Sequence, residues 1–208
     1  MNNIRFRLAK PCDAKQIAEC HWHVRDRYSQ GIFLSLGKGF LRAYYKVILN
    51  DPWEVVVCAE RGDGKIVGFG STTLDAAAQA KNLRNHKVKL GYAALFSIIA
   101  HPRLFKEVWL RYKSLKGGDR QKFVHVEGVR GEYWCWLKKE DSMLSIDMDN
   151  AKSHVVYDLG YHECFFEVDK FNTHVYKYHL KRSEPIEEIT LPDGRVRVLF
   201  KTQLKPGK

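Results

Sequence analysis

The sequence predicts an α/β fold built on a mixed sheet. Short strand-like segments alternate with amphipathic helical segments along most of the 208 residues. Two loops, residues 61–65 and 192–194, carry the Gly, Asp and Pro residues that are typical of hairpin turns. The composition, 45% hydrophobic and 12% aromatic, is that of a globular chain, long enough for one large domain or a core with an insertion.

The N-terminal part is predicted to contain a strand, two helices and a hairpin. Residues 4–10 alternate apolar and basic side chains, as a half-buried strand does. A helix follows Asp13, its predicted N-cap, and a second helix covers residues 34–51, where the next residue is a proline. Residues 53–60 and 65–74 then form the two strands of the first hairpin.

Residues 76–121 interrupt this alternation and predict a helical insertion after the third strand. Its two helices are expected at 90–100 and 102–116, on either side of a His-Pro pair. Beyond the insertion, strands are expected at 122–128, 132–139 and 162–169, helices at 142–160 and 172–182, and a closing hairpin at 186–191 and 195–204. Ser142 and Gly160 are the predicted N-cap and stop signal of the longer helix.

The charge of the chain is concentrated in the insertion. Residues 81–122 carry 11 basic and 2 acidic side chains, which accounts for +9 of the net charge of +11. Such a field attracts phosphates, anionic lipid headgroups or nucleic acid, although a solvated face of a packed insertion would look the same. The aromatic residues of the insertion follow a helical core pattern rather than a stacking surface, which argues against nucleic acid. A basic amphipathic helix of this kind suits peripheral contact with a membrane, or closure over a substrate.

Other features restrict the class of protein. The N-terminus lacks an apolar signal-peptide core and no run approaches about 20 apolar residues, so a cytoplasmic location is expected. Five widely spaced cysteines predict buried free thiols rather than disulfides. In the segment CHWH, residues 20–23, helical spacing sends the side chains to different faces, so no metal site is expected.

The order of elements resembles that of the GNAT superfamily of acyl-CoA-dependent N-acyltransferases. Residues 4–21 and 31–49 are similar to opening segments of that family, and the rest of the resemblance lies in residues 132–204. It implies one domain, residues 1–208, with a mostly antiparallel central sheet flanked by helices. It also implies transfer of an acetyl or similar group from acetyl-CoA or another acyl-CoA to an amine of a small-molecule or carrier-linked acceptor, without a metal. A homodimer is left open.

The late motif of the family is an Asn that closes a strand, with a small residue three positions on and often a Tyr seven positions on. Here Asn172, Val175 and His179 take these places. An alternative register on Asn150 and Tyr157 leaves too few residues upstream for the strand, helix and strand that must precede the motif.

In the preferred register, the resemblance implies that Tyr176, Tyr178 and His179 look toward the thioester. A Tyr178 hydroxyl or a His179 imidazole could then protonate the leaving thiolate. Aromatic packing in the core is the alternative explanation for these side chains.

The expected pyrophosphate loop departs from the family, because the segment WLKKEDSMLS has no glycine. Lys138 and Lys139 supply positive charge there, and amides near the helix start could face an anion, but Glu140 and Asp141 are acidic. Either the phosphates sit differently or tight CoA binding has been lost. The predicted cofactor-binding residues are Trp136, Leu137, Lys138, Lys139, Ser142, Met143, Asn172 and Tyr176.

Glu132 is the first choice for a general base, ahead of Glu127 and His125, because a carboxylate on the strand that flanks the acceptor could take the amine proton. Direct transfer is favoured over a covalent intermediate, since no cysteine has a persuasive His partner in the sequence. The alternative is a non-catalytic module of the same fold that binds nucleic acid or anionic lipid through the basic insertion.

Overall fold

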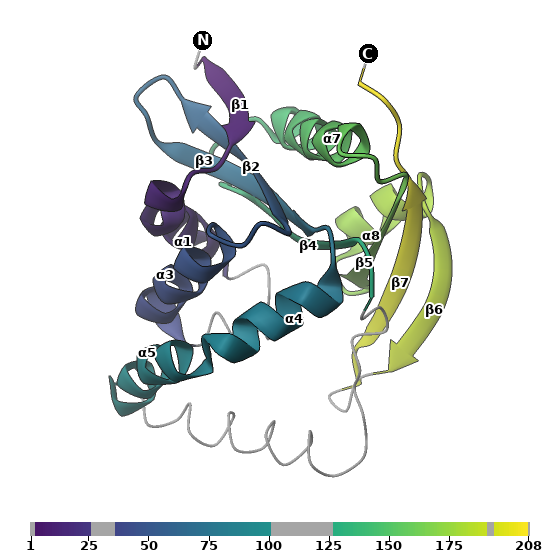
Figure 1. Cartoon of the computed structure of the whole chain (residues 1–208). Coiled ribbons are helices and arrows are strands. Elements are labelled where there is room, and N and C mark those ends of the chain that lie inside the picture. The colour runs from purple at the N-terminus through teal and green to yellow at the C-terminus, as the bar shows by residue number, and fades with distance from the viewer. Residues whose placement is uncertain (1–2, 26–35, 101–126, 191–193, 208) are drawn as a thin grey trace.

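A computed structural model describes residues 3–25, 36–100, 127–190 and 194–207, and its strands form one seven-stranded sheet (Figure 1). The strands are β1 (Ile4–Leu8), β2 (Glu54–Arg61), β3 (Ile66–Thr73), β4 (Arg130–Trp136), β5 (Glu163–Asp169), β6 (Glu184–Thr190) and β7 (Val196–Gln203). The helices are η1 (Pro11–Asp13), α1 (Ala14–His23), α3 (Gly37–Ile48), α4 (Ala76–Asn85), α5 (Lys87–Ala100), α7 (Ser142–Asp158) and α8 (Thr173–Leu180).

The sheet is mixed and mostly antiparallel, as the sequence predicted. The strand order is β1-β2-β3-β4-β5-β7-β6, and β4 with β5 is the parallel pair. β2 with β3 and β6 with β7 are antiparallel pairs, which confirms both predicted hairpins. The helical insertion follows β3, where the change in sequence pattern put it.

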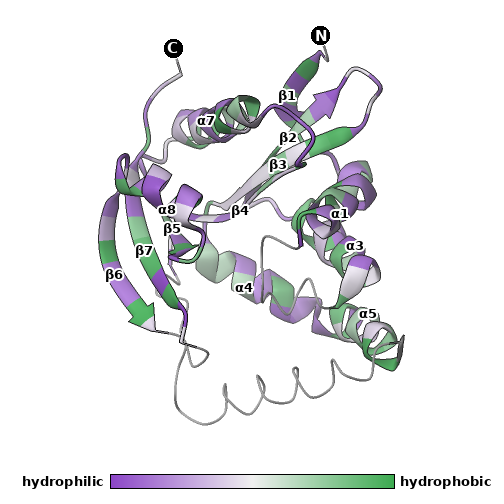
Figure 2. Cartoon of the chain, turned by 180° about the vertical axis from the view of Figure 1, so that it is seen from behind, coloured by the Kyte–Doolittle hydropathy of each residue, from purple (hydrophilic) through white to green (hydrophobic). Residues whose placement is uncertain are grey.

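Helices cover both faces of the sheet. α1 and α3 pack with part of α5 on one face, while α7 covers the other face of β2, β3 and β4 (Figures 1 and 2). α8 packs on β5 and β7 through a smaller apolar cluster. The inner faces of the first two helices follow the helical spacing of their sequences, because the residues at that spacing are at most 6% exposed: Ile17, Cys20, His21, Val24, Phe40, Leu41, Tyr44, Tyr45 and Ile48.

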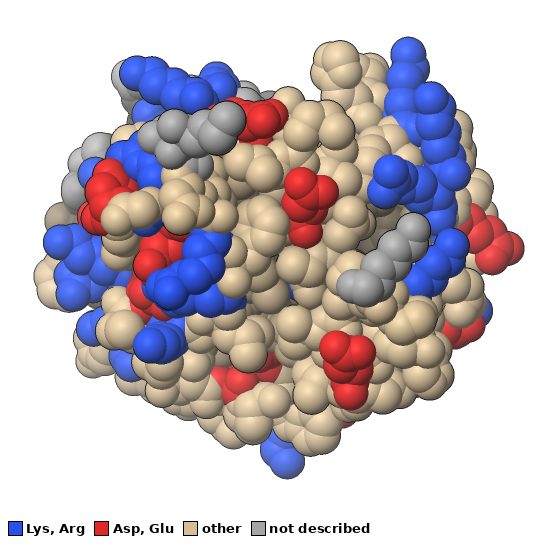
Figure 3. Space-filling model, turned by 90° about the horizontal axis from the view of Figure 1, so that it is seen from above, with Lys and Arg blue, Asp and Glu red and all other residues tan. Residues whose placement is uncertain are grey.

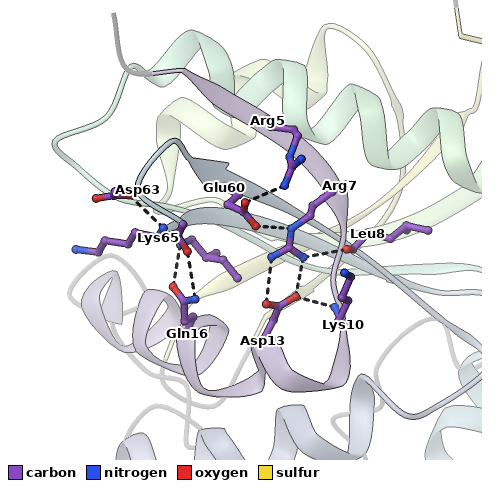
Figure 4. A network of polar contacts seen from close by, with 11 residues as sticks. Arg5, Arg7, Leu8, Lys10, Asp13, Gln16, Glu60, Asp63 and Lys65 are labelled. Carbon is purple, nitrogen blue, oxygen red and sulfur yellow. Dashed lines mark hydrogen bonds and ion pairs between the residues drawn. The ribbon is translucent and has the colours of Figure 1, made fainter.

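A polar network ties the N-terminal strand to its neighbours (Figure 4). Arg7 on β1 donates to both carboxylate oxygens of Asp13, at 2.7 and 3.1 Å, and also pairs with Glu60 on β2. Asp13 stands at the predicted N-cap position, but its carboxylate accepts from Arg7 and from the Lys10 amide rather than from the helix. Gln16 on α1 accepts from the amide of Ile66, which attaches the helix to β3.

Several predicted boundaries need correction. α7 is capped by Asp141, whose Oδ1 accepts from the Met143 amide at 2.9 Å, so Ser142 is the first helical residue and not the cap. The insertion opens with α4, which the sequence pattern missed, because its inward positions include the polar Gln79 and its apolar residues are mainly alanines. Glu127 lies in a bend, and residues 101–126, including the second predicted helix of the insertion and His125, lie outside the described part.

The cysteines are all free thiols, and four of the five are buried as predicted, whereas Cys12 is exposed. In the segment at 20–23, His21 is buried and His23 is exposed, as helical spacing requires. Among the described residues, no group of three or more His, Cys, Asp or Glu side chains has a metal-binding arrangement. None of the described helices is both long and apolar enough to cross a bilayer.

Candidate active site

A gap opens between β4 and β5. The two strands are in register at a single pair, Arg130 with Phe165, supported by a 3.1 Å bond from the Phe165 amide to the Val129 carbonyl. From there β5 continues with β7 along its whole length, while β4 continues with β3. The carboxyl-terminal halves of two neighbouring parallel strands therefore separate, and the closed end of the gap lies at Arg130 and Phe165.

The edge of β4 that faces this gap is set by strand alternation. The Leu137 amide donates to the Val67 carbonyl on β3 at 2.9 Å. Because the backbone groups of successive residues face opposite edges, those of Trp134 and Trp136 face the β5 side. Trp136 is thus oriented as its predicted cofactor-binding role requires, whereas the amide of Leu137 is already used within the sheet.

A β-bulge on β4 displaces Glu132. Ser71 pairs with Tyr133 but the next residue, Thr72, pairs with Gly131, and Ser71 Oγ accepts from the Tyr133 amide at 3.2 Å. Bulges re-aim side chains at the point where they occur. The carboxylate of Glu132 is brought to the side of the sheet that α3 and α4 cover.

On that side, four polar side chains form a chain of hydrogen bonds. Arg130 Nε donates to Glu132 Oε1 at 2.7 Å, and another Arg130 nitrogen donates to Gln79 Oε1 at 2.9 Å. Gln79 Nε2 in turn donates to Glu54 Oε1 at 2.5 Å, while Glu54 Oε2 is buried and has no hydrogen-bond partner within the described part of the chain. Burial, with the charge of Glu132 next, raises the pKa of Glu54 to about 8. The cluster therefore holds one carboxyl group that exchanges its proton close to neutral pH.

Two tyrosines border this cluster. The hydroxyls of Tyr44 and Tyr133 hydrogen-bond to each other. Burial raises the pKa of both, and the next largest cause is the charge of Tyr133 at Tyr44 and the charge of Glu132 at Tyr133. Both therefore remain neutral phenols at neutral pH. They give the face of the sheet around Glu132 a polar lining rather than an apolar one.

On the opposite face, aromatic rings bridge the gap. The Trp134 ring lies 5.5 Å from the Tyr178 ring and 5.8 Å from the His179 ring, measured between centroids. His179 also contacts Phe166 on β5 at 4.4 Å. Trp134 Nε1 donates to the Ser145 carbonyl on α7, so the bridge is held from a third element.

The two predicted proton donors differ in this environment. Burial lowers the pKa of His179 to about 4, so its imidazole is neutral at pH 7 and is a poor acid. The Tyr178 hydroxyl accepts a bond from Arg182 at 2.8 Å, and it keeps its own proton to donate. Tyr178 is therefore the better placed of the two for protonating a thiolate.

Asn172 and Tyr176 lie apart from this bridge. Asn172 is at the N-cap position of α8, without a side-chain bond to the helix. The Asp169 carboxylate turns the chain out of β5 by accepting from the Phe171 amide at 3.0 Å. The Tyr176 ring packs on the Phe200 ring of β7, with centroids 5.9 Å apart, and its cofactor-binding role stays a prediction.

The start of α7, where the pyrophosphate was expected, carries its own anions. The Asp141 carboxylate accepts a hydrogen bond from the Met143 amide, and the Glu140 carboxylate accepts one from Arg61 at 2.9 Å. Lys138, Lys139, Ser142 and Met143 are exposed around this tip. Lys138 and Lys139 would attract a phosphate group at this position, whereas the negative charge of Asp141 would repel it.

Two charged residues whose charged groups are largely buried were not predicted. Lys152 on α7 pairs with Asp149, with 2.6 Å between Nζ and Oδ1. The signal was present, because Lys152 falls on the buried stripe that Ser145, Met148 and Val156 define at helical spacing. Glu54 likewise shares one face of β2 with buried residues two and four positions on.

Similarity to known proteins is found in the fold and not in the sequence. A scan against protein-family models found no match, and a search of the curated proteins found none either. Solved structures give a different result. A GNAT-family acetyltransferase from Bacillus cereus is 9% identical with a TM-score of 0.58, and the match covers 98% of this chain and 99% of that one.

Two further matches were solved with a cofactor. A Salmonella typhimurium protein in complex with acetyl-CoA is 11% identical, with a TM-score of 0.58 over 100% of this chain and 97% of that one. The PaiA N-acetyltransferase of Thermoplasma acidophilum, in complex with coenzyme A, is 9% identical, with a TM-score of 0.56 over 97% and 99%. The chain therefore has the GNAT fold, as its order of elements predicted.

Proposed function

We propose that this chain, as one domain, is an N-acyltransferase that moves an acetyl or similar group from acyl-CoA directly to an amine. The observation that carries the proposal is the gap between β4 and β5 at the polar face around Glu132. An extended pantetheine arm would add its amides to the backbone of Trp134 and Trp136. The acceptor amine would approach from the α3 and α4 side.

In the proposed step, the amine nitrogen forms a bond to the thioester carbon and the carbon–sulfur bond breaks. The amine proton passes to the Glu132 carboxylate, directly or through water, and Tyr178 supplies a proton to sulfur. Covalent transfer through Cys20, Cys58 or Cys164 is disfavoured, because burial raises the pKa of Cys20 to about 12 and those of Cys58 and Cys164 to about 11. These buried thiols stay protonated at neutral pH.

Calorimetric titration with acetyl-CoA and with desulfo-CoA tests the cofactor site. We expect micromolar binding of both at moderate salt, weakened by Lys138→Glu and Lys139→Glu. The matched control is Lys177→Glu, an exposed lysine on α8. Failure of a folded protein to bind either compound would refute the acyltransferase proposal.

A second candidate function rests on α5, the alternative in which the insertion contacts a membrane. The helix buries one side against α3 but leaves five large apolar side chains 49% to 73% exposed: Val88, Tyr92, Leu95, Phe96 and Ile99. Figure 2 shows the hydrophobic colouring of α5. Lys81, Arg84, Lys87 and Lys89 flank this stripe, and residues 76–100 contain no acidic residue. An apolar stripe with a basic border suits an anionic lipid surface.

On the face that Figure 3 shows, the basic side chains do not form one field. Seen from above, Lys and Arg gather toward the margins of the face, and a mostly uncharged region with a few acidic groups lies between them (Figure 3). The lipid proposal therefore depends on α5. Co-sedimentation should show binding to phosphatidylglycerol vesicles but not to phosphatidylcholine vesicles.

The Phe96→Glu variant should lose this binding, whereas Phe171→Glu, equally exposed at 73% but on another part of the molecule, should keep it. Equal loss in both variants, or self-association through α5 instead of vesicle binding, would contradict the lipid proposal. Neither result would affect the acyltransferase proposal.

A further inference from the structure

The ammonium group of Lys152 is buried with few partners. The side chain is 12% exposed, and within the described residues Nζ makes one hydrogen bond, to Asp149. An ammonium carries three N–H donors, and burying them unpaired is costly. Burial disfavours the charged form, but the Asp149 charge outweighs it and raises the pKa of Lys152. Lys152 is thus a fixed cation, and two of its three N–H donors have no partner among the described residues.

Lys152 lies beneath the sheet, beside the gap between β4 and β5. A Cβ on Gly70 of β3 would come 3.2 Å from Cδ of Lys152, so the lysine stem runs directly beneath the sheet. Its charge acts on Cys164 of β5, and on Tyr178 and His179 of α8. The head group therefore lies among elements that line both sides of the separation between β4 and β5.

The distance along α7 from Ser142 to Lys152 agrees with the length of the pantetheine arm of the cofactor. The helix starts at Ser142, beside the lysines expected near the pyrophosphate. Ten residues of α-helix rise about 15 Å, which is comparable with an extended pantetheine arm. With the phosphates at the start of α7, the sulfur would arrive near Lys152.

We propose that Lys152 contacts the sulfur of acyl-CoA and stabilises the thiolate as it leaves, an inference that rests on the proposed acyltransferase function. When the carbon–nitrogen bond forms and the carbon–sulfur bond breaks, the electron pair stays on sulfur, opposite the ammonium. Lys152 keeps its proton during this step, the amine proton goes to Glu132, and the thiolate then takes the proton that Tyr178 supplies. Asp149 has a positioning role, because it holds the ammonium in place and protonated.

The test measures the acidity of bound CoA, so it needs no knowledge of the acceptor. Thiolate absorbance near 240 nm is followed against pH for the CoA complex, and the desulfo-CoA complex is subtracted to cancel Cys164. A cation within a few ångströms should lower the thiol pKa by about one unit or more relative to free CoA. That is at least a tenfold change in the acid dissociation constant.

Three variants identify the source of the shift. Lys152→Met paired with Asp149→Asn avoids leaving a lone buried carboxylate and should abolish the shift. Lys152→Arg should retain it, because the charge remains. Lys139→Met is the matched control, since it removes a cation at the phosphate end and should weaken binding without changing the thiol pKa.

The outcomes separate the two proposals. If CoA binds and its thiol pKa equals that of free CoA, or is unaffected by the double variant, the Lys152 inference is overturned while the proposed function stands. If neither CoA nor desulfo-CoA binds, both fail. A lowered thiol pKa that depends on Lys152 supports both.

Discussion

The rings of Trp134 and His179, with centroids 5.8 Å apart, join β4 to α8 across the gap between β4 and β5. The histidine is held neutral there, because burial lowers its pKa to about 4. The contact is therefore one of packing and not of charge. It makes the aromatic bridge a stable wall of the gap, and it has consequences for stability in acid.

His179→Phe should make the protein less sensitive to acid. In the unfolded chain the imidazole takes a proton near pH 6.5, whereas the folded chain resists protonation down to about pH 4, so stability falls as pH falls through this window. The variant should lose roughly 2 kcal/mol less than wild type between pH 7 and pH 5. Urea unfolding at both pH values measures this, and His174→Gln, an exposed change on the same helix, should behave as wild type.

Glu54→Gln should stabilise the protein in base. The folded-state pKa of about 8 exceeds the ordinary value near 4.5, so the folded chain holds a proton that the unfolded chain releases, and stability declines as pH rises between these values. Relative to wild type, the variant should gain about 3 kcal/mol from pH 5 to pH 8. Glu187→Gln on exposed β6 is the control. A constant difference across the range would contradict the buried state of Glu54.

Asp141→Ser should tighten CoA binding. Serine can still cap α7, but the negative charge next to the expected phosphate site is removed, which should increase affinity about threefold at low salt. Asp75→Ser is a matched control, because Asp75 caps α4 in the same way, with bonds of 2.9 and 3.0 Å from the Ala77 and Ala78 amides. Calorimetry that gave the same affinity for both variants would place the phosphates elsewhere.

Arg7→Met should destabilise the fold by about 3 kcal/mol, because it leaves the carboxylate of Asp13 without its cation when that residue is 6% exposed. Burial works against ionisation of Asp13, but bonds from Arg7 and the Lys10 amide outweigh it and lower its pKa. The stabilisation is present above the unfolded pKa and is lost as pH falls. Arg5→Met, which removes a 70% exposed partner of Glu60, should cost under about 1 kcal/mol in the same denaturant titration.

Local patterns predicted most of the framework. The inner faces of α1 and α3 could be read from the spacing of apolar residues, because burial on a helix imposes that period. Helix α4 was not predicted, because its inner face includes the polar Gln79. Glu54 and Arg130 hydrogen-bond to Gln79, which allows it to be buried. The cap of α7 was misplaced by one residue, since Asp141 and Ser142 are adjacent and both residue types cap helices well.

The site was harder to predict than the framework. Tyr178 and His179 could be found from their spacing after Asn172, and they do meet Trp134 at the gap. The burial of Lys152 and Glu54 could be predicted from their spacing, but their roles could not, because each role depends on side chains from other elements. A sequence pattern records which face a residue occupies, but it does not record which charges surround it.

The antiparallel pairing of β3 and β4 has a consequence for the history of the insertion. Residues 74–129 connect two strands that lie side by side, so this segment is, in topological terms, a hairpin loop. The entropic cost of closing a loop grows only with the logarithm of its length, by about 0.6 kcal/mol for each doubling. Residues could therefore be added or exchanged there at little cost to the sheet, which makes this connection the place where a common scaffold could most readily have acquired a new binding surface.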